Sequence, residues 1–130
     1  MPKRILSVSY DVSLLNSRQM LLQQQGYTVT SALGFTAALA ACKSGAFDLF
    51  ILGHSIPLRD KQELIRMFRA NCPAPIVSLE RVGEELPETD FHASPDNPAE
   101  FLKAVHRILG NIDVSNMPGA PGREPQDRPN

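Results

Sequence analysis

Few residues of this chain combine a reactive side chain with a sequence context for chemistry, and His54 is the first of them. It follows Gly53 and the apolar run from Leu49 to Leu52, a place where an imidazole can bind a metal ion or accept a phosphoryl group. No cysteine, second histidine or pair of aspartates adjoins it in the sequence. We therefore interpret His54 as a loop histidine that points into a pocket.

The serines and cysteines lack the context that would make them nucleophiles. Ser9, Ser78 and Ser94 lie outside any G-x-S-x-G segment and belong to no ordered catalytic triad. Cys42 and Cys72 form no CxxC pair, which favours reduced and unreactive thiols. We therefore predict that the chain is not an enzyme.

The composition is typical of one globular domain. With 130 residues, of which 42% are hydrophobic, the chain can bury a single core without disulfides or a structural metal. Its 13 basic and 14 acidic residues nearly cancel and form no basic cluster, so we expect no nucleic-acid or membrane partner. The N-terminal apolar run is short and interrupted by serines, which predicts no signal peptide, no membrane span and a cytoplasmic location.

Short apolar runs alternate with segments of helical periodicity, and this alternation predicts a parallel sheet with helices on both faces. The run from Leu49 to Leu52 is apolar throughout, as expected for a central strand that is buried on both faces. The other predicted strands are residues 5–8, 27–31, 76–79 and 90–93.

Three helices are predicted between the first four strands. Asp11 or Ser13 can cap the first, which runs to about residue 25 and ends at Gly26. The second is rich in small residues and lies around residues 36–43. Asp60 is the predicted N-cap of the third helix.

The last predicted helix has the clearest signals. Asn97 is its expected cap, proline occupies the first helical position and glutamate the third. Its apolar stripe consists of Phe101, Leu102, Val105, Ile108 and Leu109. Residues 111–130 hold four prolines and few large apolar groups, so we expect a domain over residues 1–110 followed by a disordered tail.

The segment from Phe47 to Pro57, FDLFILGHSIP, resembles the receiver domains of two-component response regulators, in which a buried strand is followed by Asp-x-x-Met-Pro. The stretches KRILSVSYD, LLQQQGYTVTSA and IPLRDKQELIRMFR are similar to further receiver segments in the same order. The resemblance implies a flavodoxin-like (CheY-like) three-layer α/β sandwich with a five-stranded parallel sheet of order 2-1-3-4-5. It also implies a protein partner, either a histidine kinase or another signalling protein, and leaves the oligomeric state open.

The same resemblance identifies where the phosphorylation residues of a receiver would fall. The acceptor aspartate falls at Gly53, and the two metal-binding carboxylates fall at Ser9 and Tyr10. The hydroxyl residue of the fourth strand falls at Glu80, or at Ser78 if that strand slips, and the lysine after the fifth strand falls at Ser94.

These positions predict a degenerate receiver without a metal or another cofactor. Asp11 is the acid that remains close to the first strand, and a single carboxylate is a poor Mg²⁺ site. Removal of an acidic cluster also removes repulsion among buried acids, so we expect a domain held in one state.

The crossover between the fourth and fifth strands is short. Ten residues, from Glu80 to Thr89, are available for it, and Gly83 and Pro87 interrupt them. A parallel crossover normally needs a dozen residues or more and contains a helix. The fourth helix is therefore expected to be shortened or lost.

Three functions remain open at this stage. The first is a stand-alone receiver that binds a protein partner without being phosphorylated. The second is a small-ligand sensor that uses the emptied pocket at the carboxyl ends of the strands. That pocket would be lined by Ser9, Tyr10, Asp11, Gly53, His54, Glu80 and Ser94. The third is a conventional phosphoacceptor that uses an unusual residue.

Overall fold

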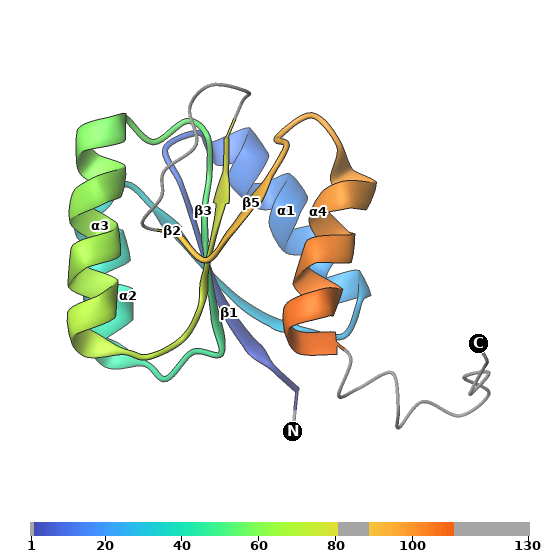
Figure 1. The fold of residues 1–130 in the computed structure, drawn as a ribbon, viewed down its shortest axis with the longest axis horizontal. Coiled ribbons are helices and arrows are strands. Elements are labelled where there is room, and N and C mark those ends of the chain that lie inside the picture. The colour runs from blue at the N-terminus through green and yellow to red at the C-terminus, as the bar shows by residue number, and fades with distance from the viewer. Residues whose placement is uncertain (1, 81–88, 111–130) are drawn as a thin grey trace.

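Five parallel strands form the middle layer of the protein (Figure 1). The structure is a computed structural model and describes residues 2–80 and 89–110. The strands follow the order β2-β1-β3-β4-β5, which confirms the order implied by the receiver resemblance. Their bounds are β1 Arg4–Ser9, β2 Thr28–Leu33, β3 Leu49–Leu52, β4 Ile76–Leu79 and β5 Phe91–Ala93.

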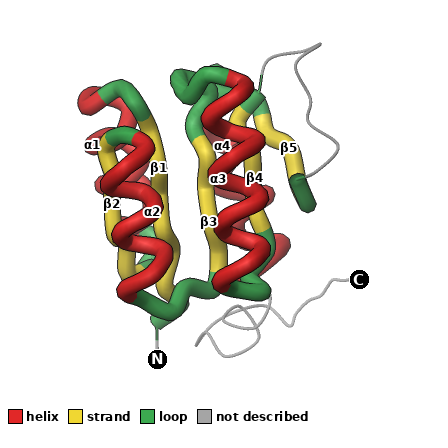
Figure 2. The backbone as a smooth tube through the Cα atoms, turned by 90° about the vertical axis from the view of Figure 1, so that its left-hand side faces the viewer, coloured by secondary structure: helices red, strands yellow, loops and turns green. Residues whose placement is uncertain are grey.

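Helices cover both faces of this sheet. On one face α2 and α3 lie side by side, and on the other face lie α1 and α4 (Figures 1 and 2). A π-helical turn, His106–Gly110, continues α4 toward the C-terminus. The helices are α1 Val12–Gln24, α2 Phe35–Ser44, α3 Leu58–Asn71 and α4 Pro98–Val105.

The central strand β3 contributes to both halves of the core. Alternate residues of a strand point to opposite faces, so Phe50 packs with the residues under α2 and α3 while Ile51 packs with those under α1 and α4. The ring of Phe50 stacks on that of Phe68, with centroids 4.4 Å apart. All four residues of β3 are fully buried, which confirms the prediction of a strand buried on both faces.

The N-caps of α1 and α4 are residues that the sequence predicted, whereas the N-cap of α3 is not. The Asp11 carboxylate accepts a hydrogen bond from the Leu14 N–H, and the Asn97 side chain accepts one from the Glu100 N–H, each 3.0 Å long. The prediction that Asp60 caps α3 was wrong. Because the fixed φ of Pro57 allows the helix to begin directly after it, Asp60 lies within the first turn.

Two predictions concern residues outside the described ranges. The crossover between β4 and β5 falls almost wholly within residues 81–88, and the tail comprises residues 111–130. The described residues on either side of the crossover, Glu80 and Thr89, are not helical. Within the described ranges, no helix has the length and apolar character that crossing a membrane would require.

Candidate functional site

The five positions implied by the resemblance lie where the strands end. Ser9 is the last residue of β1, and Tyr10, Gly53, Glu80 and Ser94 each follow directly on a strand. Because all the strands are parallel, their carboxyl ends lie at one edge of the sheet, where ligands bind in folds of this class. We call these five residues the carboxyl-end site.

A neutral hydrogen-bond network joins the two loops at the first part of this site. The hydroxyl groups of Ser9 and Ser55 lie 3.0 Å apart, and Ser55 Oγ also accepts a 3.0 Å hydrogen bond from the Tyr10 N–H. The Asp11 N–H donates to Ser9 Oγ. The loop after β1 is thereby tied to the loop after β3 without any buried charge.

A second contact ties the same region to α3. The Tyr10 hydroxyl donates a 2.8 Å hydrogen bond to the carboxylate of Asp60. Burial, together with this hydrogen bond and the negative charge of Asp60, raises the pKa of Tyr10 above its ordinary value. The Tyr10 side chain is therefore a neutral donor in a place where the resemblance implies a metal-binding carboxylate.

Replacing Tyr10 with phenylalanine removes this hydrogen bond while keeping the ring. We expect the free energy of unfolding to fall by about 1 kcal/mol, as measured by urea denaturation at neutral pH. The raised pKa stabilises the folded protein below the ordinary tyrosine pKa of 10.0, and this contribution is lost as the pH rises above it. The difference between wild type and variant should therefore shrink above that pH; a constant difference would contradict this account.

Arg18 occupies the space that a side chain at position 53 would need. An ideal Cβ placed on Gly53 would lie 2.7 Å from Arg18 Nη1 and 3.2 Å from the carbonyl oxygen of Val8. The Arg18 side chain comes from α1, is 7% exposed, and places Nη2 3.3 Å from His54 Nδ1. Arg18 Nη1 is buried and has no hydrogen-bond partner among the described residues. Burial lowers the pKa of this guanidinium, and the charge of Asp11 opposes the change.

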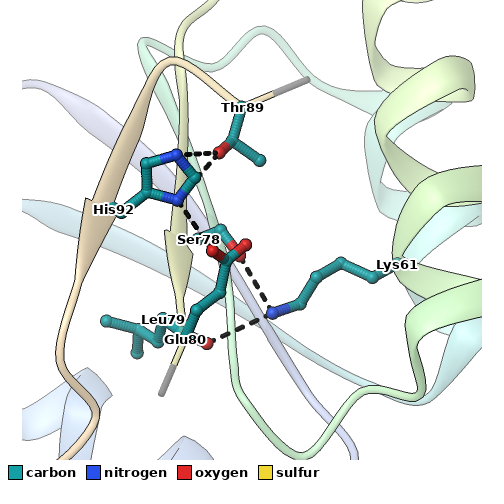
Figure 3. A network of polar contacts seen from close by, with 6 residues as sticks. All are labelled: Lys61, Ser78, Leu79, Glu80, Thr89 and His92. Atoms are coloured by element: carbon teal, nitrogen blue, oxygen red, sulfur yellow. Dashed lines mark hydrogen bonds and ion pairs between the residues drawn. The ribbon is translucent and has the colours of Figure 1, made fainter. Parts of the chain in front are cut away.

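A second cation, Lys61, is buried beside the end of β4 (Figure 3). Its ammonium group donates a 2.9 Å hydrogen bond to Ser78 Oγ and a 3.2 Å hydrogen bond to the carbonyl oxygen of Leu79. The β4 strand keeps its predicted bounds, so Ser78 has not slipped to the position that follows the strand. The Ser78 hydroxyl instead serves as a partner of Lys61.

Glu80 contacts His92 on the β5 side of the site. Its carboxylate lies 2.7 Å from Nδ1 of His92, and its side chain is 2% exposed. The Thr89 hydroxyl lies 3.4 Å from both ring nitrogens of His92 (Figure 3). Glu80 and His92 therefore link the end of β4 to β5, so the role of this contact is to stabilise the fold.

Ser94 belongs to the start of α4. Its N–H donates to the Glu100 carboxylate at 3.1 Å, and its hydroxyl accepts from the Asp96 N–H at 3.2 Å. Ser94 also lines a cavity of about 230 Å³ between α1 and α4, together with Arg18. The structure thus brings Ser9, Tyr10 and Gly53 close to one another, whereas Ser94 faces a separate space.

Arg18 and Lys61 were not predicted from the sequence, although both carry a recognisable signal. On α1 the buried residues are Leu15, Arg18 and Leu22, and on α3 Lys61 precedes the buried Leu64 by three positions. Each cation therefore occupies a position of an apolar helical stripe. A charged residue at such a position is a reason to look for a buried polar partner.

The described part of the chain contains no cluster of side chains that could bind a metal ion. No group of three or more histidine, cysteine, aspartate or glutamate side chains is placed to hold an ion there. The Asp11 carboxylate, two residues after the end of β1, instead caps α1.

The chain is similar in sequence to two regulatory proteins, although it matches no family model. The regulatory protein VanRc of Enterococcus gallinarum is 26% identical over 117 residues, which cover 84% of this chain and 51% of VanRc. The transcriptional regulatory protein ResD of Bacillus subtilis is 25% identical over 114 residues, which cover 82% of this chain and 48% of ResD.

A solved structure is similar over nearly its whole length. The response regulator TrrA of Thermotoga maritima, crystallised in complex with Mg²⁺ and BeF, is 25% identical and superposes with a TM-score of 0.72. The similarity covers 82% of this chain and 99% of the TrrA chain. The chain spans about half the length of the curated relatives it matches. The chain is therefore similar in sequence to two-component response regulators, and its strand order and fold are those of a CheY-like receiver domain.

Proposed function

We propose that this receiver domain acts in cytoplasmic two-component signalling by binding a protein partner without being phosphorylated. The observation that carries the proposal is the position of Arg18. Its guanidinium fills the space beside Gly53 where the resemblance implies an acceptor side chain, with Nη1 2.7 Å from an ideal Cβ. Glycine offers no nucleophile at this position, and a side chain there would have to displace the Arg18 guanidinium, which supports the proposal.

The charges of the site also favour this proposal over ordinary phosphorylation. A receiver that accepts a phosphoryl group needs carboxylates to hold Mg²⁺, whereas Ser9 and Tyr10 contribute neutral hydrogen bonds. Arg18 and Lys61 add two buried cations close to the strand ends. Like charges repel strongly where water is excluded, so these cations disfavour a divalent metal.

The loops that would respond to phosphorylation are already held together. Ser55 links the loops after β1 and β3, and Tyr10 links the first of them to Asp60. These contacts favour a single resting arrangement of the site. A histidine kinase or another signalling protein would then recognise this one arrangement.

Exposed apolar side chains near the same edge support a protein partner. Val12 begins α1, Leu33 ends β2 and Leu58 begins α3, and these side chains are 55%, 50% and 57% exposed. Apolar groups of this size at a rim are common where proteins dock. The alternative of a small ligand among the residues of the carboxyl-end site has less support, because Ser9 and Tyr10 already use their hydroxyl groups and Arg18 fills the space at Gly53.

Intact-mass measurement after incubation with acetyl phosphate and Mg²⁺ tests the proposal. We expect no phosphoryl adduct under conditions in which a receiver with an acceptor aspartate becomes modified. An adduct on the wild-type protein that disappears in the His54→Ala variant would overturn the proposal and identify His54 as the acceptor. An adduct that survives in this variant would also overturn it and would point to another residue.

A further inference from the structure

The cavity between α1 and α4 has a mostly apolar lining with a few polar groups, and it adjoins the carboxyl-end site through Arg18 and Ser94. Its volume is about 230 Å³, which is below the ~300–1,000 Å³ of pockets for drug-sized ligands. Leu21, Leu79 and Phe101 contribute apolar walls, while Ser94 and Asn97 add polar groups. A compact ligand with an apolar body fits such a lining.

Arg18 gives this cavity a specific electrostatic character. Among the described residues that line it, Arg18 is charged and none is acidic. The guanidinium is buried, its Nη1 has no hydrogen-bond partner among those residues, and the contact of Nη2 with His54 is 3.3 Å long. A buried cation is stable when it is paired with an anion and hydrogen bonded. The Arg18 guanidinium at this cavity therefore has no hydrogen bond to a carboxylate among the described residues, although the charge of Asp11 acts on it.

The start of α4 adds to the same preference. Asn97 and Pro98, the N-cap and the first residue of that helix, both line the cavity. The N-terminus of a helix carries a partial positive charge that favours a nearby anion. The guanidinium thus favours negative charge at this cavity, and the helix end adds to it less, because Glu100 already places a carboxylate in the first turn.

We propose that this cavity binds a small molecule that has one carboxylate and a compact apolar group, with the carboxylate paired to Arg18. Because Nη1 is shielded from solvent, the guanidinium must turn away from Gly53 to meet the ligand. That movement breaks the 3.3 Å contact with His54. The Arg18 guanidinium has no other hydrogen bond to the described residues that the movement could break. The ligand would therefore also open the space beside Gly53, at the carboxyl-end site.

Benzoate is a suitable probe, and benzyl alcohol is its neutral counterpart. In an NMR titration of the ¹⁵N-labelled protein, we expect benzoate to shift the backbone amides of Ser17, Arg18, Ser94 and Asn97 saturably, with a dissociation constant of about 1 mM or lower. Benzyl alcohol should bind at least about tenfold more weakly, because it has the ring without the charge. Equal binding of both probes, or no saturable shift with benzoate, would overturn the proposal.

Variants separate the role of Arg18 from a general effect of charge. Arg18→Met keeps an apolar stem and should weaken benzoate binding at least about tenfold, whereas Arg59→Met, which removes an exposed arginine of α3, should leave it unchanged. If Arg18→Met does not fold, Ser94→Phe fills the cavity from its rim and should abolish the shifts. Benzoate binding that persists in a folded Arg18→Met or Ser94→Phe protein would contradict the assigned site.

Discussion

Replacing Gly53 with alanine should lower the free energy of unfolding by about 1–3 kcal/mol, which is the usual cost of forcing a methyl group into a filled space. The new Cβ would lie 2.7 Å from Arg18 Nη1 and 3.2 Å from the Val8 carbonyl oxygen. The guanidinium can move aside, but the backbone oxygen of a central strand moves much less. Urea denaturation of wild type and variant measures the difference.

A double-mutant cycle with Arg18→Met tests the cause. In the methionine background no guanidinium has to be displaced, so the alanine should cost less than it does in wild type, although the 3.2 Å contact with the Val8 carbonyl oxygen remains. Equal costs in both backgrounds would show that Arg18 does not fill the space at position 53. The Gly53→Asp variant should form an ion pair with Arg18 and remain unmodified by acetyl phosphate, because the guanidinium holds its carboxylate and no carboxylate pair replaces Ser9 and Tyr10.

Truncating Lys61 to alanine should destabilise the domain by about 3 kcal/mol, the largest effect that we expect at this edge of the sheet. The side chain is 4% exposed and donates hydrogen bonds to Ser78 Oγ and the Leu79 carbonyl oxygen. The substitution would leave a cavity where the aliphatic part of Lys61 packs. The Ser78 hydroxyl and the Leu79 carbonyl oxygen would also lose the ammonium group as a hydrogen-bond donor. Urea denaturation again provides the measurement.

The Lys61→Met variant separates these two contributions. Methionine retains most of the buried stem and loses only the ammonium group, so we expect a smaller loss of about 1–2 kcal/mol. A methionine variant as stable as wild type would mean that the cost of burying the ammonium cancels the benefit of its hydrogen bonds. The role assigned to Lys61 in holding the end of β4 would then be wrong.

The sheet was predictable because its signals are local. The run from Leu49 to Leu52 was expected as a doubly buried strand and has those bounds in the structure. Residues 76–79 were also predicted as a strand with the observed bounds. Asn97 caps its helix as expected, and Asp11 is the one of the two expected candidates, Asp11 and Ser13, that caps α1. Caps are predictable because they depend on a side chain and a backbone N–H three residues later.

The interior of the carboxyl-end site was not predictable in the same way. Tyr10 and Asp60 are fifty positions apart, and only the folded sheet brings them together. The side chains of Arg18 and Lys61 are long enough to reach either solvent or the core from the same helical position. Their direction depends on the space that Gly53 and Ser78 leave open, which no local pattern encodes.

The hydrogen bonds of Ser55 to the loop after β1 have a consequence for how this protein transmits information. An ordinary switch changes shape when a kinase modifies it, so its output follows the modified fraction. If the site has a single arrangement that needs neither a metal nor a phosphoryl group, its occupancy by a partner follows mass action alone. The cell would then adjust the response through the rates at which the protein is made and degraded.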